Sequence, residues 1–261
     1  MLWMRFSHDG NTGFGCLQDD RILVHEGDLF DSPRPTGRSI ETAAVQWLAP
    51  CVPSKFICLW NNFHAAAAKQ SQAIPAEPLW VIKAASAVSA HRQPIVAPAP
   101  AAYDGRVVFE GELGVVIGRR CRHVSEADAP DFIFGYTCVN DVTAVELIAR
   151  DPAFAQWTRA KSFDTFGPFG PVIATGLDPS GLVVRTLVGG RERQNYPVAD
   201  MIFSPAQLVS RLSRELTLEP GDLISCGTSL GVMPMRPGHS IEVSIEGIGT
   251  LSNEYVAAPP A

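Results

Sequence analysis

Short apolar runs separated by turn residues recur along the whole chain, and they predict a protein built mostly of β-strands. The clearest runs predict strands at residues 14–17, 21–24, 56–60, 79–82, 107–117, 133–139, 223–226 and 241–245. Helices are predicted over residues 62–72, which contain four consecutive alanines, and 200–218, where apolar residues recur at close to helical spacing. Residues 32–37 and 93–105 are rich in proline and predict loops. Because many strands are accompanied by few helices, the pattern favours an α+β, mostly β fold.

Composition and charge exclude several classes of protein. The 261 residues, 46% of them hydrophobic, suffice for one large domain or one domain with a small appendage. With 21 basic and 27 acidic residues the net charge is −6, which argues against a nucleic-acid partner. No apolar run approaches the ~20 residues that span a bilayer, and Arg5 precedes any apolar run that could form a signal peptide. We therefore expect a cytoplasmic protein with no membrane partner.

The cysteines and the C-terminal tail carry little functional information. None of the six cysteines forms a C-x-x-C pair, which argues against a zinc knuckle or a redox dithiol and favours reduced thiols. The tail at 257–261 is expected to fray.

Two carboxylates within a predicted strand and a third at the end of another form the first candidate site. Glu110 and Glu112 are two residues apart, so in a strand they point to the same face, where they repel each other unless a cation lies between them or one is protonated. Asp141 follows the apolar run 132–140 and offers a third oxygen ligand. Such a set favours Mg²⁺, with Mn²⁺ and Ca²⁺ as competitors. The alternative is a solvated strand face for the glutamates and a turn or cap role for Asp141.

Two further segments carry polar groups that could contact a ligand. Residues 156–171 are interpreted as a rigid, irregular loop framed by two Gly-Pro steps, and Lys161 in this loop could hold an anionic oxygen or lie on the surface. Residues 220–232 end a strand in a glycine-rich loop, where backbone N–H groups and the Thr228 hydroxyl could meet an anion. The lysine of a phosphate-binding P-loop is absent from this segment.

The order of these segments resembles the fumarylacetoacetate hydrolase superfamily. The resemblance rests on E-x-E at 110–112, G-Y-T-x-x-N-D at 135–141, R-x-K-S-F-D-T-F-x-P-x-G-P at 159–171, P-G-D-x-I-x-x-G-T-x-x-G-V at 220–232 and G-I-G-x-L-x-N at 247–253. It covers roughly residues 54 to 256. It implies a mixed β-roll in layers of sheet, sheet and helix, assembled as a homodimer. It also implies a small N-terminal β domain at 1–50 and a catalytic domain at 51–261.

The resemblance also implies roles for individual residues. Glu110, Glu112 and Asp141 would hold Mg²⁺ or Mn²⁺, which chelates the oxygens of a small 2-oxo acid substrate or of its enol. Lys161 and Thr228, within these motifs, and Lys83, within residues 79–84, match residues of the family that act on the substrate. Arg159, Asp164 and Gly227 are further substrate-binding candidates.

One motif of the family is altered in this chain. The family's G-x-N-Y-x-x-H-A-x-E, whose His and Glu activate water in hydrolytic members, aligns so that Ala66 and Lys69 take those two positions. His64 could substitute as a catalytic residue, but two residues on a helix are ~200° apart, so it would face away if the turn is already helical. The alternative for His64 is a helix-start residue without a catalytic role.

Three hypotheses follow. The first is a metal-dependent isomerase, tautomerase or decarboxylase of a 2-oxo acid in catabolism, including that of aromatic compounds, because such enolate chemistry needs the metal but no activated water. The second is a C–C hydrolase of the fumarylpyruvate, acylpyruvate or fumarylacetoacetate type, against which Ala66 and Lys69 argue. The third is a non-catalytic metal-binding member of the family, against which the intact carboxylates and Lys161 argue.

Overall fold

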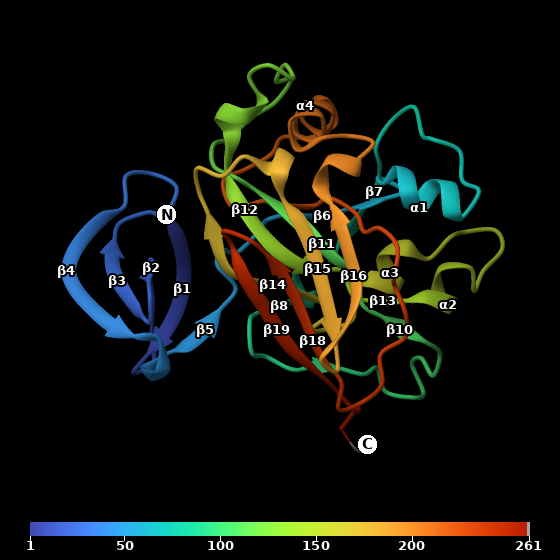
Figure 1. The fold of residues 1–261 in the computed structure, drawn as a ribbon, viewed down its shortest axis with the longest axis horizontal. Helices are drawn as coiled ribbons and strands as arrows, with labels where there is room; N and C mark the ends of the chain where they lie inside the picture. The colour runs from blue at the N-terminus through green and yellow to red at the C-terminus, as the bar shows by residue number, and fades with distance from the viewer. Residues whose placement is uncertain (260–261) are drawn as a thin grey trace.

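Strands are the main regular secondary structure of residues 1–259, the part of the chain that this computed structural model describes (Figure 1). The last two residues of the tail at 257–261, which is expected to fray, lie outside the described residues. Within residues 1–259, no helix is both long enough and apolar enough to cross a membrane.

The larger sheet is mixed and contains the strands that carry the candidate site. Its members are β1 (Leu2–His8), β2 (Asn11–Gln18), β3 (Arg21–Glu26), β4 (Arg34–Glu41), β5 (Gln46–Leu48), β6 (Phe56–Trp60), β7 (Leu79–Lys83), β8 (Val88–Ser89), β11 (Gly111–Ile117), β12 (Ile133–Asn140), β14 (Gly167–Ala174) and β17 (Leu223–Ser225). They run in the order β4-β3-β2-β1-β14-β12-β11-β17-β6-β7, with β5 beside β1 and β8 beside β14. The β17–β6 and β14–β8 pairs are parallel and the other pairs are antiparallel.

A second sheet covers one face of the first and completes the core. It contains β9 (Ile95–Val96), β15 (Val183–Val188), β16 (Arg191–Pro197), β18 (Ser240–Ile245) and β19 (Gly249–Val256), in the order β16-β15-β18-β19-β9. Figure 1 shows it in front of β11, β12 and β14. Buried side chains of the two sheets, such as Leu113 and Val115 on β11 and Val184 and Val243 on β15 and β18, share one hydrophobic core. A separate two-stranded sheet pairs β10 (Val107–Val108) with β13 (Thr143–Ala144).

Four short α-helices flank the sheets: α1 (His64–Lys69), α2 (Val145–Ile148), α3 (Trp157–Lys161) and α4 (Pro205–Glu215). The Ser204 side chain caps the N-terminus of α4 in a capping box with Gln207, and Pro205 stands at a position where its missing N–H costs nothing. Leu208 and Leu212 of α4 pack into the core shared by the sheets. The expected layers of sheet, sheet and helix are confirmed.

The N-terminal strands form a curved lobe beside the rest of the protein, at the left of Figure 1. Strands β1–β5 lie within residues 2–48, and β1 joins β14 through the pairs Leu2–Ala174 and Trp3–Ile173. The small N-terminal β region that the resemblance implies is therefore present, and it extends the larger sheet.

Six segments differ from the sequence predictions. The loop predicted at 93–105 contains the short strand β9, which pairs with β19. The prediction of a loop at 32–37 is wrong from Arg34 onward, because β4 begins there and pairs with β3 along the edge of the sheet. The irregular loop predicted at 156–171 instead contains α3 and β14. Pro171 is tolerated in β14 because pairing with β12 is irregular between Tyr136 and Cys138. The predicted helices shorten to α1 and α4, the latter because Ser204 and Pro205 fix its start. The strand predicted at 107–117 is interrupted at 109–110.

Candidate metal centre and cavity

Glu110 and Glu112 flank Gly111, the first residue of β11. Gly111 is required here because a Cβ atom would lie 2.1 Å from Oγ1 of Thr186 on β15. Its N–H donates to Oε1 of Gln194 on β16 at 3.0 Å. The second sheet therefore packs directly against the start of β11 and fixes the backbone from which both glutamates project.

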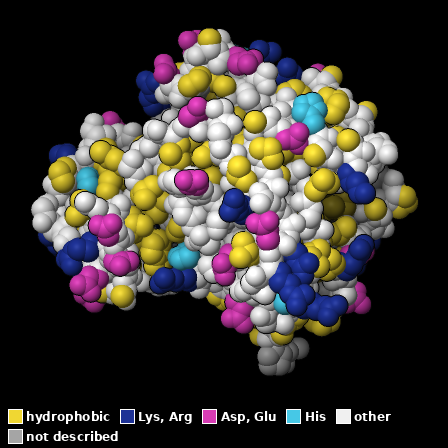
Figure 2. Space-filling model, viewed as in Figure 1, with side chains coloured by type: hydrophobic (Ala, Val, Ile, Leu, Met, Phe, Trp, Pro, Cys, Tyr) yellow, Lys and Arg dark blue, Asp and Glu magenta, His cyan; other side chains and the backbone are white. Residues whose placement is uncertain are grey.

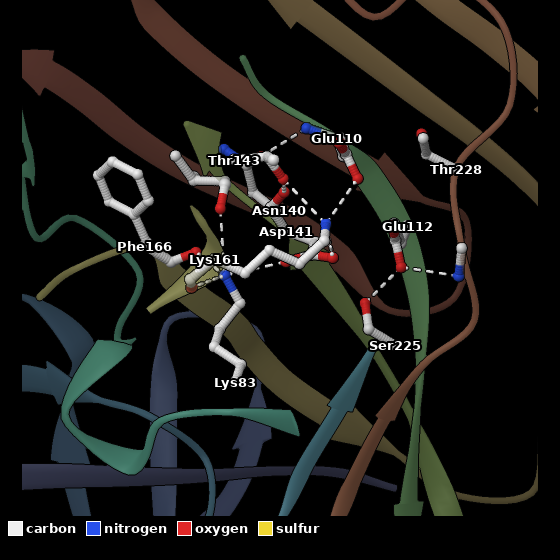
Figure 3. Close-up of polar contacts among 12 residues, drawn as sticks. Lys83, Glu110, Glu112, Asn140, Asp141, Thr143, Lys161, Phe166, Ser225 and Thr228 are labelled. Carbon is white, nitrogen blue, oxygen red and sulfur yellow. Dashed lines mark hydrogen bonds and ion pairs between the residues drawn. The ribbon is translucent and has the colours of Figure 1, made fainter. Parts of the chain in front are cut away.

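The three predicted carboxylates meet at the ends of β11 and β12 (Figure 3). One ligand oxygen from each of Glu110, Glu112 and Asp141 can be chosen so that the three lie within 4.8 Å of one another. The Asp141 N–H donates to the Glu110 carbonyl at 2.8 Å, which joins the two strand ends. The side chains of Glu112 and Asp141 are buried, whereas Glu110 keeps 17% of its side chain exposed toward the cavity described below. The alternative of a solvated strand face is excluded.

Lys161, at the end of α3, places its ammonium group among these carboxylates (Figure 3). Its Nζ donates to Oδ2 of Asp141 at 2.5 Å, to Oε2 of Glu110 at 3.1 Å and to Oγ1 of Thr143 at 2.9 Å. Only 3% of the Lys161 side chain is exposed, so the alternative of a surface lysine is excluded. All three N–H donors of the ammonium are used.

Lys83, at the end of β7, lies behind Asp141 and away from the cavity. Its Nζ is 2.9 Å from Oδ1 of Asp141 and also donates to the carbonyls of Val142, Lys161 and Phe166 at 3.2, 2.5 and 2.7 Å. The Lys83 side chain is fully buried. Its ammonium group contacts protein oxygens on all sides, which is the geometry of a group that positions Asp141.

The glycine-rich segment after β17 holds Glu112 in place. Oε2 of Glu112 accepts hydrogen bonds from the Ser225 hydroxyl and from the Gly227 N–H, the latter at 2.8 Å. Thr228 borders the cavity, where its hydroxyl donates to the Gly111 carbonyl at 3.0 Å and accepts from Nε2 of Gln194 at 2.8 Å. Gly227 and Thr228 therefore contact the metal-ligand region, although their roles toward a substrate remain predictions.

Burial and neighbouring charges shift the pKa values of the three carboxyl groups in different directions. Burial raises the pKa of Glu112 well above the usual range, and the neighbouring Asp141 and Glu110 raise it further. Burial also raises the pKa of Glu110, more than Lys161 lowers it. For Asp141, burial alone would raise the pKa, but Lys161 and Lys83 outweigh it and the pKa lies below its ordinary value. The carboxylates in turn raise the pKa of Lys161, although burial alone would lower it.

These residues fit a divalent cation. Oε1 of Glu112 is buried and has no hydrogen-bond partner among residues 1–259. A buried carboxylate oxygen without a donor is costly unless a cation neutralises it. Three carboxylates suit a hard ion with oxygen ligands.

A cavity of about 330 Å³ opens from the carboxylates toward α1, α2 and α3. Glu110, Lys161 and Thr143 lie at its inner end. Its sides come from the end of β6, the three short helices and the loop 228–232. In Figure 1 the helices α1, α2 and α3 lie together at the right of the molecule.

Three other predicted site residues lie outside this cavity lining. His64 is exposed at the first turn of α1, whereas Ala66 on the same helix lines the cavity. Arg159 is exposed on α3. Asp164 is exposed and lines a separate shallow pocket with Val96 and Phe163. Their assigned roles remain predictions that this geometry does not support directly.

Sequence reasoning missed several residues that support the centre. Asn62 is buried, donates to the carbonyls of Phe203 and Cys226 at 3.2 and 2.8 Å, and thereby ties the start of α1 to the Gly227 segment. Gln194 reaches Gly111 and Thr228 from the second sheet. The Asn62-Phe63 step within the altered family motif could have identified Asn62. No local pattern singles out Gln194, because its partners are more than thirty residues away in the chain.

Comparisons with known proteins agree with this geometry. The family described as fumarylacetoacetate (FAA) hydrolase C-terminal matches residues 55–256, and an Rv2993c-like N-terminal family matches residues 1–50. A 2-hydroxyhepta-2,4-diene-1,7-dioate isomerase from Mycobacterium marinum superposes with a TM-score of 0.90 at 37% identity, covering 100% of both chains. Oxaloacetate tautomerase YisK of Bacillus subtilis is 38% identical over 77% of this chain and 70% of its own.

A more distant structure was solved with ligands. It is a maleylpyruvate hydrolase from Sphingobium sp. SYK-6 in complex with manganese(II) and pyruvate, with a TM-score of 0.80 and 25% identity, covering 99% of this chain and 100% of the other. The family match over residues 55–256 and the full-length structural likeness lead to one conclusion: this chain belongs to the fumarylacetoacetate hydrolase family.

Proposed function

We propose that this protein is a divalent-metal-dependent enzyme that isomerises, tautomerises or decarboxylates a small 2-oxo acid or its enol. The observation that carries the proposal is the cluster of three carboxylates beside Lys161 at the inner end of a cavity. Mg²⁺ is the first candidate for the ion, with Mn²⁺ and Ca²⁺ as alternatives. A divalent ion held there would draw electron density from the oxygens of a 2-oxo acid and favour loss of a proton or of CO₂ at the neighbouring carbon.

The chain's own groups supply orientation and charge. The Lys161 ammonium can stabilise, through its charge, the negative charge that develops on a nearby oxygen of the acid, because it lies at the cavity end and its acidic surroundings raise its pKa. Thr143 donates to the Asp141 carbonyl at 3.0 Å and accepts from Lys161, which fixes the direction of that ammonium. Lys83 positions Asp141 from behind.

The composition of the cavity favours enolate chemistry over hydrolysis. Among the described residues that line the cavity, Glu110 and Lys161 are the only titratable side chains, and both contact each other. Ala66 lines the cavity at the position where hydrolytic members of the family carry a histidine. Activation of an attacking water needs a base within hydrogen-bond reach, so hydrolysis of an acylpyruvate is the less supported alternative.

Activity assays test the proposal directly. The protein would be given oxaloacetate, acylpyruvates and 2-hydroxydienoates, each with added Mg²⁺ or Mn²⁺ and each after chelation with EDTA. Metal-dependent tautomerisation, isomerisation or decarboxylation is expected, with slower hydrolysis. Faster metal-dependent hydrolysis would favour the hydrolase, and metal binding without turnover of any compound would favour the non-catalytic alternative.

The remaining proposals concern organisation. We propose residues 51–261 as the catalytic domain, because every candidate site residue lies there. A homodimer follows from the family expectation and can be measured by light scattering coupled to gel filtration. A cytoplasmic location is supported by the six cysteines, none of which forms a disulfide within residues 1–259.

A further inference from the structure

The cavity beyond the carboxylates has apolar walls. Trp60 at the end of β6 and Trp157 at the start of α3 lie against each other, with ring centroids 5.6 Å apart and ring planes tilted by 54°. Val145 and Ile148 of α2 line the same cavity. Leu230 and Val232 line it from the glycine-rich loop, and both are among the exposed large hydrophobic residues of the described chain. Figure 2 shows a recess with hydrophobic side chains at its base on this side of the molecule.

No cationic group on these walls is available to a second anion. Lys161 is the only lysine or arginine among the described residues that line the cavity, and its three N–H donors are bound to Glu110, Asp141 and Thr143. Neutral donors also line the cavity: the Gln70 and Ser229 side chains carry no positive charge, and two others are engaged with the protein. The Asn61 amide donates to the Ala73 carbonyl at 2.9 Å, and the Thr228 hydroxyl donates to the Gly111 carbonyl. Lysine and arginine side chains near the recess in Figure 2 lie at the surface, where water screens their charge.

A carboxylate buried against such walls would lose its hydration without gaining a cationic partner, which is unfavourable. An apolar or aromatic group in the same place gains from burial and from contact with the two tryptophan rings. We propose that the substrate is a 2-oxo acid with a single carboxylate, and that its other end is an apolar or aromatic group held between α2 and the Trp60–Trp157 pair. This inference rests on the proposed function and adds the substrate class to it.

The test compares acids of matched shape. In 5-methyl-2-oxohexanoate an isopropyl group replaces the distal carboxylate of 2-oxoglutarate, so the two acids differ mainly in charge. Calorimetry with the Mn²⁺-loaded protein would measure both, with phenylpyruvate as an aromatic probe. We expect the isopropyl compound and phenylpyruvate to bind at least about tenfold more tightly than 2-oxoglutarate, in line with pockets that discriminate apolar from polar groups.

A wall substitution makes the test specific. Ile148 is half-buried, so Ile148→Arg can be accommodated with its head group toward solvent or toward a ligand carboxylate. This variant should bind 2-oxoglutarate about tenfold more tightly than the unmodified protein does, since a cation then faces the distal carboxylate. Ile148→Leu is the matched control and should keep the original preference. Metal affinity measured without acid should be equal in all three proteins.

The outcomes separate the two proposals. If 2-oxoglutarate binds the unmodified protein as tightly as the isopropyl compound, the apolar substrate class is wrong, while the proposed function stands because a 2-oxo acid still binds with the metal. If none of the acids binds the metal-loaded protein, the proposed function itself is wrong. If Ile148→Arg fails to fold, the comparison within the unmodified protein still decides the matter.

Discussion

Lys161 Nζ lies 2.5 Å from Oδ2 of Asp141, inside a group of three carboxyls that a divalent cation would also occupy. In the metal-free protein this ammonium supplies positive charge that the buried carboxylates require. A bound cation would supply more, so Lys161 and the metal stabilise the same negative charges. The lysine therefore has two separable effects, one on the stability of the metal-free protein and one on the reaction.

Replacing Lys161 by methionine separates those effects. Without metal, Lys161→Met should lower the free energy of unfolding by about 3 kcal/mol, because it removes one partner of a buried ion pair. Metal should then raise the melting temperature more in the variant than in the unmodified protein. Turnover should fall about 10²-fold or more in kcat, since positive charge near the reacting oxygens is lost.

Thermal melts with EDTA and with Mn²⁺, together with steady-state kinetics, would measure this. Arg38→Met, which removes an exposed cation on β4 outside the cavity lining, is the control and should change neither quantity. A raised KM with unchanged kcat would instead make Lys161 a group that only anchors the substrate.

Replacing Asp141 by asparagine tests the ligand set. Asp141→Asn keeps the shape of the side chain but deletes one ligand charge, so affinity for Mg²⁺ or Mn²⁺ should fall by two orders of magnitude or more. Calorimetry with the metal alone gives the answer without an activity assay. Asp164→Asn, at an exposed position outside the cavity, serves as the control. Unchanged metal affinity in Asp141→Asn would rule out this aspartate as a ligand.

The sequence was most informative where chemistry depends on local spacing. Glu110 and Glu112 follow from a two-residue strand period, and the motif at 159–171 identified Lys161. The structure brings these residues together with Asp141, although strand β11 begins only at Gly111. Strand β14 was missed because its two Gly-Pro steps are typical of loops, whereas pairing with β12 and β8 overrides that preference.

The features that the sequence could not predict depend on contacts between residues that are far apart in the chain. The setting of Lys83 depends on carbonyls of residues 142, 161 and 166, which are far from it in the chain. A glycine is required at position 111 because a Cβ atom there would collide with Thr186 on the second sheet, and no local pattern reveals that contact. The apolar cavity walls combine residues of six separate segments, so their common character becomes visible only in the folded protein.

His91 should make the protein sensitive to mild acid. Burial, with a smaller contribution from Arg92, lowers the pKa of His91 to about 4, and its Nδ1 accepts a hydrogen bond from the Ser252 N–H at 3.1 Å. The unfolded chain, with a pKa near 6.5, therefore binds the proton first as the pH falls. The stabilisation by neutral His91 is complete above pH 6.5 and is lost progressively as the pH falls toward 4.

Denaturant unfolding of His91→Gln between pH 7.5 and 4.5 would measure this effect. Glutamine can still accept the Ser252 hydrogen bond but cannot titrate, so stability should fall less with acidification in the variant than in the unmodified protein. His64→Gln, at an exposed position, should leave the pH dependence as it is. Parallel pH profiles for His91→Gln and the unmodified protein would contradict the assignment.

Restoring the family's His and Glu at positions 66 and 69 should give the protein hydrolytic activity. Ala66 lines the cavity and Lys69 follows three residues later on α1, so both positions share one helix face. The double change Ala66→His with Lys69→Glu would supply a base and a carboxylate to orient it. General-base assistance typically supplies ~10²–10⁴-fold, so acylpyruvate hydrolysis should rise by about 10²-fold. Metal-dependent tautomerisation or decarboxylation should stay much as it was.

A control on the same helix tests whether the new His and Glu must face the cavity or need only be present. Ala68 is exposed and does not line the cavity, so Ala68→His with Lys69→Glu adds the same groups where they cannot reach a bound substrate. Only the change at Ala66 should accelerate hydrolysis, because general-base catalysis requires the base within hydrogen-bond reach of the water. Efficient hydrolysis by the unmodified protein, insensitive to both double changes, would mean that another group supplies the base, and His64→Ala would test the imidazole already present on α1.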